Sequence, residues 1–248
     1  MKVICSGMPK TGTKTICQAL RTLGYNVYDF EEQFWYLGDQ LKKVLDEGWT
    51  NEEMRDLFEG VDAVTDVPGC TLWEEILTAY PDAKIVHMER ESDEEWGKSF
   101  DKQMKTIRGN IFMRILVLLS PTGRKLRQFF NTTLRCQASN MHFSPLFNRP
   151  VNVSFAKTRY REHNANVRQS APKDQILFFK HSDGWDPLCK FLGQPVPSTP
   201  YPHRNKGGEI VEELVAESYV FVQIKKEVQM SLAAFVLAIG LIVYMFML

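Results

Sequence analysis

The chain has 248 residues, of which 44% are hydrophobic and 24% are charged, a composition that supports a large buried core and excludes a disordered or fibrous protein. Its 30 basic and 30 acidic residues cancel, so the overall charge gives no reason to expect a nucleic-acid partner. The five cysteines are widely spaced and form no CxxC pair, which argues against a disulfide framework or a zinc site and favours a reducing compartment.

The first stretch of the chain has the pattern strand, turn, helix. Val3 to Cys5 is a β-prone run, Gly7 to Thr13 is a turn, and the apolar helical stripe that follows ends at Gly24. Such a turn presents backbone N–H groups at the positive end of a helix, where Lys10 and Lys14 add charge. The stretch therefore predicts a phosphate site.

The spacing of this turn differs by one residue from the Walker pattern. Gly7 and Gly12 have the required separation, and Gly12 would let an anion come close, but Thr13 stands between Gly12 and Lys14. In a nucleotide kinase, Thr15 directly after Lys14 would hold Mg²⁺. The loop by itself leaves three alternatives: a kinase loop, another kind of phosphate site, or an ordinary strand-to-helix turn.

A carboxylate follows the third predicted strand. Strands are predicted at Tyr25 to Tyr28 and at Val61 to Val67, and the latter stops at Pro68. Helices between these strands are predicted over 32–45 and 51–58. Asp66 then lies at the carboxyl end of its strand, the edge at which open parallel sheets bind ligands.

A second anion-binding pair is predicted at the next strand end. A helix over 72–80 and a strand over 84–88 are followed directly by Arg90. The helix after Arg90, which continues to about residue 107, carries Ser99. The guanidinium and the hydroxyl suit a phosphate, and a salt bridge with a neighbouring carboxylate is the alternative for Arg90.

The stretch 108–155 is the least regular part of the sequence. From 103 to 168 the charged residues are Lys and Arg, with Glu162 as the exception. Ile111 to Leu119 is apolar, too short to cross a membrane and interrupted by Arg114, so it predicts a buried or interfacial helix. The basic stretch is compatible with a lid on an anionic cofactor, with contact to acidic lipid headgroups, or with solvated charge.

The remaining elements complete an α/β pattern. Helices are predicted over 157–169 and 185–192, with a strand over 176–180. Five strands that alternate with helices predict a three-layer fold around a parallel sheet. A Pro-rich segment then leads to Arg204 and Lys206, which predicts either a segment that closes over a phosphate or a surface turn.

The C-terminal stretch has the length of a membrane span. Met230 to Leu248 contains no charged residue and, at about 1.5 Å per residue, reaches roughly 28 Å. It predicts a single-pass anchor, with a buried core helix as the alternative. Lys225 and Lys226 precede the span, so the positive-inside rule predicts a domain that faces the cytosol. The chain is thus divided into a domain over 1–208, a polar linker helix over 209–229 and an anchor over 230–248.

Taken in order, these motifs resemble the P-loop-like sulfotransferases, in particular a branch of short, single-domain members found in many eukaryotes. The first turn is similar to the family loop G-x-P-[RK]-[TS]-G-T, through Gly7, Pro9, Lys10, Thr11, Gly12 and Thr13. Asp66-x-Pro68, the run AYPDAKIVHMER with Trp96 and Ser99 after it, and the segments YREHNANVRQSAPKDQILFF and GWDPLCKFLGQPVPSTPYPHRN also look like the family. The resemblance covers about residues 2–100 and 155–205.

This resemblance implies a P-loop-like sulfotransferase fold and the donor 3′-phosphoadenosine 5′-phosphosulfate (PAPS), whose sulfuryl group passes to a hydroxyl or amine of a small-molecule acceptor without a metal. The donor-binding residues that it implies are Pro9, Lys10, Thr11, Gly12, Thr13, Lys14, Arg90, Ser99, Arg204 and Lys206. Lys10 would neutralise charge on the bridging oxygen, and Asp66 would act as general base, with His163 a weaker candidate.

The sequence departs from the family pattern at several points. The gap from Arg90 to Ser99 is one residue longer, so Lys98 is an alternative to Ser99, and Lys14 replaces a small hydroxyl residue. Residues 101–154, which should shape the acceptor pocket, match no known motif. A tail-anchored nucleotide-binding pseudoenzyme or scaffold and a P-loop kinase remain as alternative functions.

Overall fold

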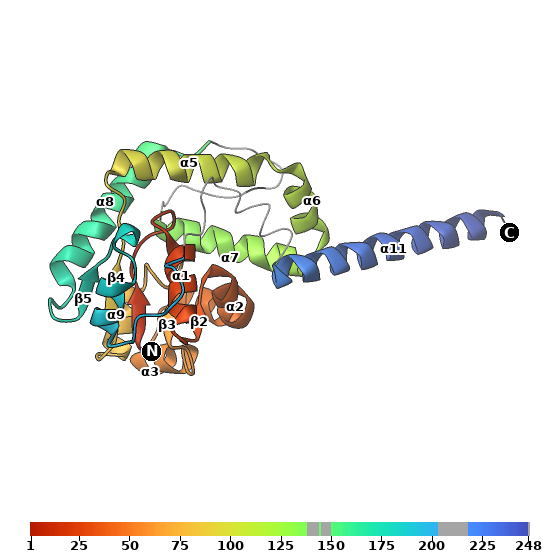
Figure 1. The fold of residues 1–248 in the computed structure, drawn as a ribbon. Helices are drawn as coiled ribbons and strands as arrows, with labels where there is room; N and C mark the ends of the chain where they lie inside the picture. The colour runs from red at the N-terminus through yellow and green to blue at the C-terminus, as the bar shows by residue number, and fades with distance from the viewer. Residues whose placement is uncertain (138–143, 145–149, 203–217, 248) are drawn as a thin grey trace.

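A parallel five-stranded sheet forms the centre of the molecule, in the strand order β2-β3-β1-β4-β5 (Figure 1). The computed structural model describes residues 1–137, 144, 150–202 and 218–247. The strands are β1 (Val3–Cys5), β2 (Val27–Tyr28), β3 (Ala63–Val64), β4 (Lys84–His87) and β5 (Ile176–Phe178). The predicted α/β fold with five parallel strands is confirmed, and four of the strands are shorter than predicted.

Helices connect the strands and cover the sheet. They are α1 (Thr13–Thr22), α2 (Phe30–Glu47), α3 (Asn51–Leu57), α4 (Trp73–Ala79), α5 (Asp93–Gly109), α6 (Ile111–Leu119), α7 (Pro121–Gln137), α8 (Val153–Ser170), the short 3₁₀ helix η1 (His181–Asp183), α9 (Trp185–Leu192) and α11 (Tyr219–Met247). Capping side chains explain why two helices begin earlier than the sequence predicted. Asp29 accepts a 2.8 Å hydrogen bond from the Phe30 N–H, so α2 begins two residues before the predicted position. Asn152 caps α8, which begins four residues before the predicted position, by accepting a 3.0 Å hydrogen bond from the Phe155 N–H.

Alternate residues of the strands pack on opposite faces of the sheet. Ile4 lies in a buried cluster with side chains of α2, α3 and α4, whereas Val3 and Cys5 lie in a second cluster with side chains of α1 and α9. Because both faces are covered, the three residues of β1 are at most 1% exposed. The sheet and its two helical layers hold the carboxyl ends of β1, β3 and β4 at a common edge.

A helical extension continues from this edge. Helix α5 packs against α8, and α6 and α7 lead on toward α11 (Figure 1). The α5–α8 contact is centred on the Trp96 ring, which stacks between Phe100 and Tyr160 at centroid distances of 4.8 and 4.4 Å. These aromatic contacts fix α5 and α8 beside the first loop.

Helix α11 has two parts with different surroundings. Val220, Phe221, Ile224 and Val228 are buried among side chains of the domain, whereas Met230 to Met247 is exposed along its length. The sequence placed 209–229 in a polar linker helix; in the described part of that segment, one apolar stripe packs against the domain while the opposite face is exposed. Residues 209–217 lie outside the described part of the chain.

Candidate active site

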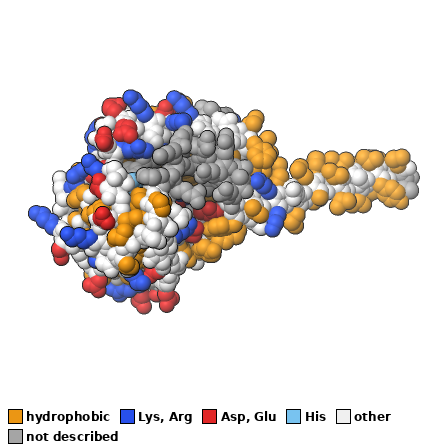
Figure 2. All heavy atoms as spheres, in the orientation of Figure 1, with side chains coloured by type: hydrophobic (Ala, Val, Ile, Leu, Met, Phe, Trp, Pro, Cys, Tyr) orange, Lys and Arg blue, Asp and Glu red, His pale blue; other side chains and the backbone are white. Residues whose placement is uncertain are grey.

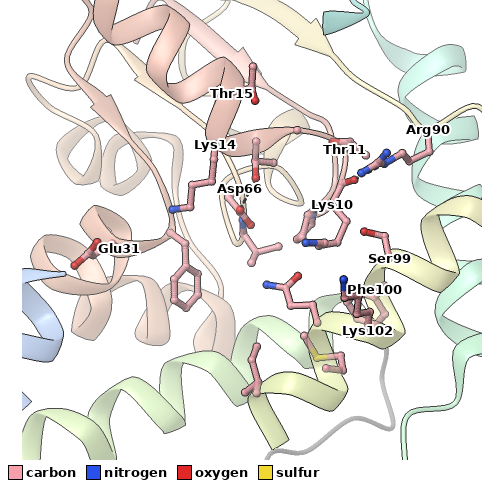
Figure 3. A pocket seen from close by; sticks show the side chains of 18 of the residues that line it. Lys10, Thr11, Lys14, Thr15, Glu31, Asp66, Arg90, Ser99, Phe100 and Lys102 are labelled. Atoms are coloured by element: carbon pink, nitrogen blue, oxygen red, sulfur yellow. Dashed lines mark hydrogen bonds between the residues drawn. The ribbon is translucent and has the colours of Figure 1, made fainter. Parts of the chain in front are cut away.

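The loop between β1 and α1 lies on the wall of a cavity of about 1450 Å³. Lys10, Asp66, Arg90, Ser99 and Lys102 surround this cavity (Figure 3). They come from four different segments: the loop, the end of β3, the end of β4 and helix α5. The structure therefore brings together the loop residues, Asp66, Arg90 and Ser99, which the sequence singled out separately.

At two glycines of the loop, neighbouring groups pack so closely that a side chain would not fit. Gly12 has a φ of 101°, and a Cβ added to it would lie 2.1 Å from Nε2 of His181. The His181 ring also contacts the Thr11 carbonyl at 3.2 Å. The sequence predicts that Gly12 lets an anion come close, and the structure adds that the His181 imidazole also packs against this glycine. A Cβ on Gly7 would meet the Met88 carbonyl at 2.8 Å.

Side chains from α5 and from the end of β4 hold the loop in place. The Trp96 indole N–H donates to the Pro9 carbonyl at 2.8 Å, and the Arg90 Nε–H donates to the Lys10 carbonyl at 2.7 Å. Thr11 Oγ1 donates to the Met8 carbonyl at 2.7 Å. Lys10 is held at a φ of 74°, in the left-handed region that non-glycine residues seldom occupy. The neighbouring elements thus fix a strained loop conformation.

Positive charge gathers beside the loop. Burial lowers the pKa of Lys10, and the positive charges of Arg90 and Lys102 lower it further, against the opposing effect of Asp66. Arg90 faces the loop and also forms a 2.8 Å ion pair with Glu95, so both of the roles considered for it are compatible with its position. Because these neighbouring positive charges repel one another, an anion bound between them would be stabilised.

The residues of α5 that face the cavity include one that the sequence did not single out. Ser99 lines the cavity, as does Lys102 one turn later, whereas the alternative residue Lys98 is exposed and does not line it. Residues three apart on a helix share a face, so the spacing from Ser99 was the signal that pointed to Lys102.

Lys14 is engaged by a buried carboxylate. Its Nζ donates to Asp29 Oδ2 at 2.5 Å, and Asp29 is almost fully buried. Burial alone would lower the pKa of Lys14, but the Asp29 and Asp66 carboxylates outweigh it and hold the pKa above its usual range. A Walker-type lysine reaches the nucleotide phosphates, whereas this lysine is part of an internal ion pair.

Asp66 sits beside the loop with a carboxylate suited to accept a proton. One of its oxygens accepts a 2.8 Å hydrogen bond from Thr13 Oγ1, and the other accepts one from the Val67 N–H. Burial and, second, the Asp29 charge raise the pKa of Asp66 to about 6, although Lys14 and these hydrogen bonds oppose the shift. A group with this pKa is largely ionised at neutral pH and still able to take up a proton.

His163, the weaker candidate for the base, lies elsewhere. Its Nε2 is hydrogen-bonded to the Ser6 carbonyl at 2.7 Å, and His163 is not among the described residues that line the cavity. Burial lowers the pKa of His163 to about 4. Its ring therefore contacts the backbone directly after β1.

Comparison with known proteins gives the family. Residues 2–210 match the family model described as a sulfotransferase domain. The chain belongs to the sulfotransferase family. It is also 30% identical over 219 residues to a protein of Aspergillus versicolor named Ava biosynthesis cluster protein M, with 82% of this chain and 80% of that protein covered. The resemblance drawn from the loop, Asp66-x-Pro68 and the closing third is confirmed, and the protein is a transferase.

Away from the loop, most of the side chains that line the cavity of this sulfotransferase are apolar, with Glu31, Gln103 and Arg127 among the polar exceptions. Its walls come from α2, α5, α6, α7 and the first turn of α11. The apolar side chains that line it are Phe30, Phe34, Phe100, Met104, Ile107, Met113, Val117, Leu126, Phe130, Leu134, Val220 and Phe221. Most of these residues belong to the stretch 101–154 or to α11, where no motif pointed to a site.

Two expected donor-binding residues, Arg204 and Lys206, lie outside the described residues of the sulfotransferase. In the ranges that are described, no three His, Cys, Asp or Glu side chains lie close enough together to hold a metal ion.

Proposed function

We propose that this sulfotransferase moves a sulfuryl group from PAPS to a hydroxyl or amine of a small-molecule acceptor. The observation that carries the proposal is that Lys10 and Asp66 lie on the wall of one cavity, together with the other residues of the loop (Figure 3). A cation for the leaving oxygen and a base for the acceptor are the two groups that the transfer requires.

The donor set fits a substrate with two anionic groups. The 5′-phosphosulfate would lie at the amino terminus of α1, whose cap residue Gly12 has no side chain to accept from the first helical N–H groups. The Thr11 N–H donates to the Met8 carbonyl, so the backbone donors for this group are expected from Gly12 onward. The Thr11 and Thr13 hydroxyls complete the expected site; they donate to the Met8 carbonyl and to Asp66 in this structure, so each would turn from that partner toward the bound anion.

The 3′-phosphate would be bound by the second cationic group. Arg90, Ser99 and Lys102 line the same cavity from the far side of Lys10. A planar guanidinium and an ammonium are both suitable phosphate ligands. Arg204 and Lys206 remain part of the proposal as residues that close over this phosphate.

The transfer itself uses two residues. Asp66 takes the proton from the acceptor oxygen or nitrogen as that atom forms its bond to sulfur. The bond between sulfur and the bridging oxygen breaks, and Lys10 stabilises the negative charge that develops on that oxygen. The products are the sulfated acceptor and adenosine 3′,5′-bisphosphate. Lys14 holds Asp29 and lends positive charge near Asp66, a supporting role in place of direct contact with the donor.

We also propose that α11 anchors the protein in a membrane, with the domain on the cytosolic side. The helix is long and apolar enough to cross a bilayer, with a mean hydropathy of 2.4 over its most apolar window. Lys225 and Lys226 lie just before the exposed part, on the side that the positive-inside rule assigns to the cytosol.

Calorimetry and turnover measurements test the proposed function. The full chain in detergent should bind adenosine 3′,5′-bisphosphate without Mg²⁺ and prefer it to ATP with Mg²⁺; the reverse preference would support a kinase. With labelled PAPS and a panel of phenols, alcohols and amines, the wild type should turn over, whereas Lys10→Ala and Asp66→Asn should not. Binding of the bisphosphate without turnover in the wild type would instead indicate a pseudoenzyme.

A further inference from the structure

The outer face of α6 is an exposed apolar surface. Ile111, Phe112 and Ile115 are 69%, 52% and 47% exposed, and Leu118 and Leu119 are also exposed. At 100° per residue these five positions fall within one arc of the helix, opposite Met113 and Val117. A continuous patch of large apolar side chains on a soluble domain marks a surface that contacts something apolar.

This surface lies at the level where the anchor leaves the domain. Helix α6 packs against α11, and Ser231 Oγ of α11 donates to the carbonyl of Leu119, the last residue of α6, at 3.3 Å. Ser231 lies near the start of the exposed, uncharged part of α11. In Figure 1, α6 runs across the direction of α11 instead of along it. If α11 crosses a membrane as proposed above, a helix in this position would lie along the surface of that membrane.

We propose that the outer face of α6 is inserted in the headgroup region of the bilayer that α11 spans. Three features favour lipid over a second copy of the chain or another protein. The patch is continuous with the exposed apolar side chains of α11 from Met230 onward (Figure 2). The exposed Lys226 lies at the base of the anchor, where anionic headgroups would meet it. An apolar helical face parallel to the membrane is the usual form of an interfacial helix.

The position of α6 also suggests where the acceptor comes from. Met113 and Val117, on the inner face of α6, line the apolar part of the cavity, which the first turn of α11 also helps to form. One helix thus separates the bilayer from the acceptor chamber. Together with the proposed function, on which this step rests, the arrangement assigns lipophilic alcohols or phenols that partition into the membrane as the acceptor class.

Depth-dependent quenching tests the position of α6 without any assay of activity. The full chain would be reconstituted in vesicles of phosphatidylcholine and phosphatidylglycerol, with Cys136 replaced by Ser and an NBD fluorophore on Ile115→Cys. The other four cysteines are buried. Lys190→Cys, on the exposed side of α9, serves as the matched control. Nitroxide-labelled lipid should quench the fluorophore at position 115 but not at 190, and aqueous iodide should do the reverse.

The other outcomes of this measurement overturn the proposal. Quenching by iodide at position 115, as at 190, would place α6 in water. Protection at 115 from both quenchers would mean that a protein, such as a second copy of the chain, covers the patch.

Turnover then tests the acceptor class. The variant Ile111→Ser/Phe112→Ser/Ile115→Ser is compared with Tyr36→Ser/Trp49→Ser/Val196→Ser, which removes exposed apolar side chains elsewhere. The α6 variant should lose about fivefold or more in transfer to a long-chain alcohol dissolved in the vesicles, yet keep transfer to a water-soluble phenol within about twofold. Equal rates of both variants on the lipid-dissolved alcohol would overturn delivery from the bilayer. A wild type inactive on both acceptors would refute the proposed function, and the quenching result would still stand.

Discussion

Asp66 combines a hydrogen bond to the loop with a pKa close to neutrality. Its carboxylate accepts from Thr13 Oγ1, and burial raises its pKa to about 6. Because a general base must be ionised to act, kcat/KM should rise as pH increases through about 6 and level off above pH 7. A pH–rate profile of the wild type checks this. A profile that stays flat between pH 5 and 8, with chemistry rate-limiting, would exclude Asp66 as the base.

Lys102 and Lys98 offer a matched pair on the same helix. Lys102 lines the cavity beside Ser99, whereas Lys98 is exposed away from it. A charged hydrogen bond to phosphate contributes about 1.5–3 kcal/mol, so Lys102→Ala should weaken binding of adenosine 3′,5′-bisphosphate by roughly 10- to 100-fold. Lys98→Ala should bind as the wild type does. Titration calorimetry compares the two variants, and equal affinities would remove Lys102 from the donor site.

Alanine variants of Gly12 and Gly60 can separate two contributions to the free energy of unfolding: the strain of a left-handed backbone and the clash of an added Cβ. Both have positive φ angles, 101° and 73°, but a Cβ on Gly60 meets no atom within 4 Å, whereas one on Gly12 would overlap the His181 ring. Gly60→Ala should therefore cost only the strain, about 1–2 kcal/mol of unfolding free energy. Gly12→Ala should cost more and also weaken binding of the bisphosphate.

Denaturant unfolding and titration calorimetry compare the two alanine variants. Gly60→Ala should keep the affinity of the wild type, since Gly60 lies outside the cavity lining. If Gly12→Ala is no less stable than Gly60→Ala and binds the bisphosphate equally well, the packing of His181 against the loop does not shape the donor site.

At the scale of elements, Glu227 links the base of α11 to the start of α7. Its carboxylate accepts hydrogen bonds from the Ser120 hydroxyl and from the Thr122 N–H and hydroxyl, the last two at 2.9 and 2.6 Å. Burial would raise the pKa of Glu227, but these hydrogen bonds outweigh it and lower the pKa to about 2, from an ordinary 4.5. The negative charge also lies at the positive end of a helix.

Substitution of Glu227 should therefore destabilise the protein in a pH-dependent way. A lowered pKa in the folded state stabilises the protein above pH 4.5, and this contribution is lost as pH falls through about 2. Glu227→Gln should cost about 1–2 kcal/mol at pH 7, the lower part of the range for charged hydrogen bonds because the group is partly exposed. Unfolding at pH 7 and at pH 3 checks this, and a difference that does not shrink at low pH would contradict the assignment.

Some features of the fold were predictable from the sequence and others were not. The strands, the capped helices and the loop were predicted because local periodicity, capping residues and turn glycines specify them within a few residues. The close packing of His181 against Gly12 was not predictable, since His181 comes from a segment after β5, about 170 residues away in the sequence. The sequence placed a pocket in residues 101–154 but could not name the side chains that line it, because most of them lie on ordinary apolar faces of α5, α6 and α7. Such faces look like core positions until their tertiary arrangement leaves a space between them.

For the whole molecule, the domain includes the first turns of the helix that carries the anchor. Val220, Phe221, Ile224 and Val228 are buried in the main core cluster, and side chains become exposed from Gln229 onward. A chain that ends at residue 229 should therefore be soluble without detergent and should bind adenosine 3′,5′-bisphosphate. A chain that ends at residue 217 should unfold at a clearly lower temperature, because each lost buried side chain of this size contributes about 1.5–3 kcal/mol. Thermal unfolding of the two truncated proteins, with and without bisphosphate, compares them. Equal melting temperatures would show that the base of α11 is a separable linker. If the chain that ends at residue 229 aggregates while the full chain stays soluble without detergent, the exposed part of α11 belongs to the folded core.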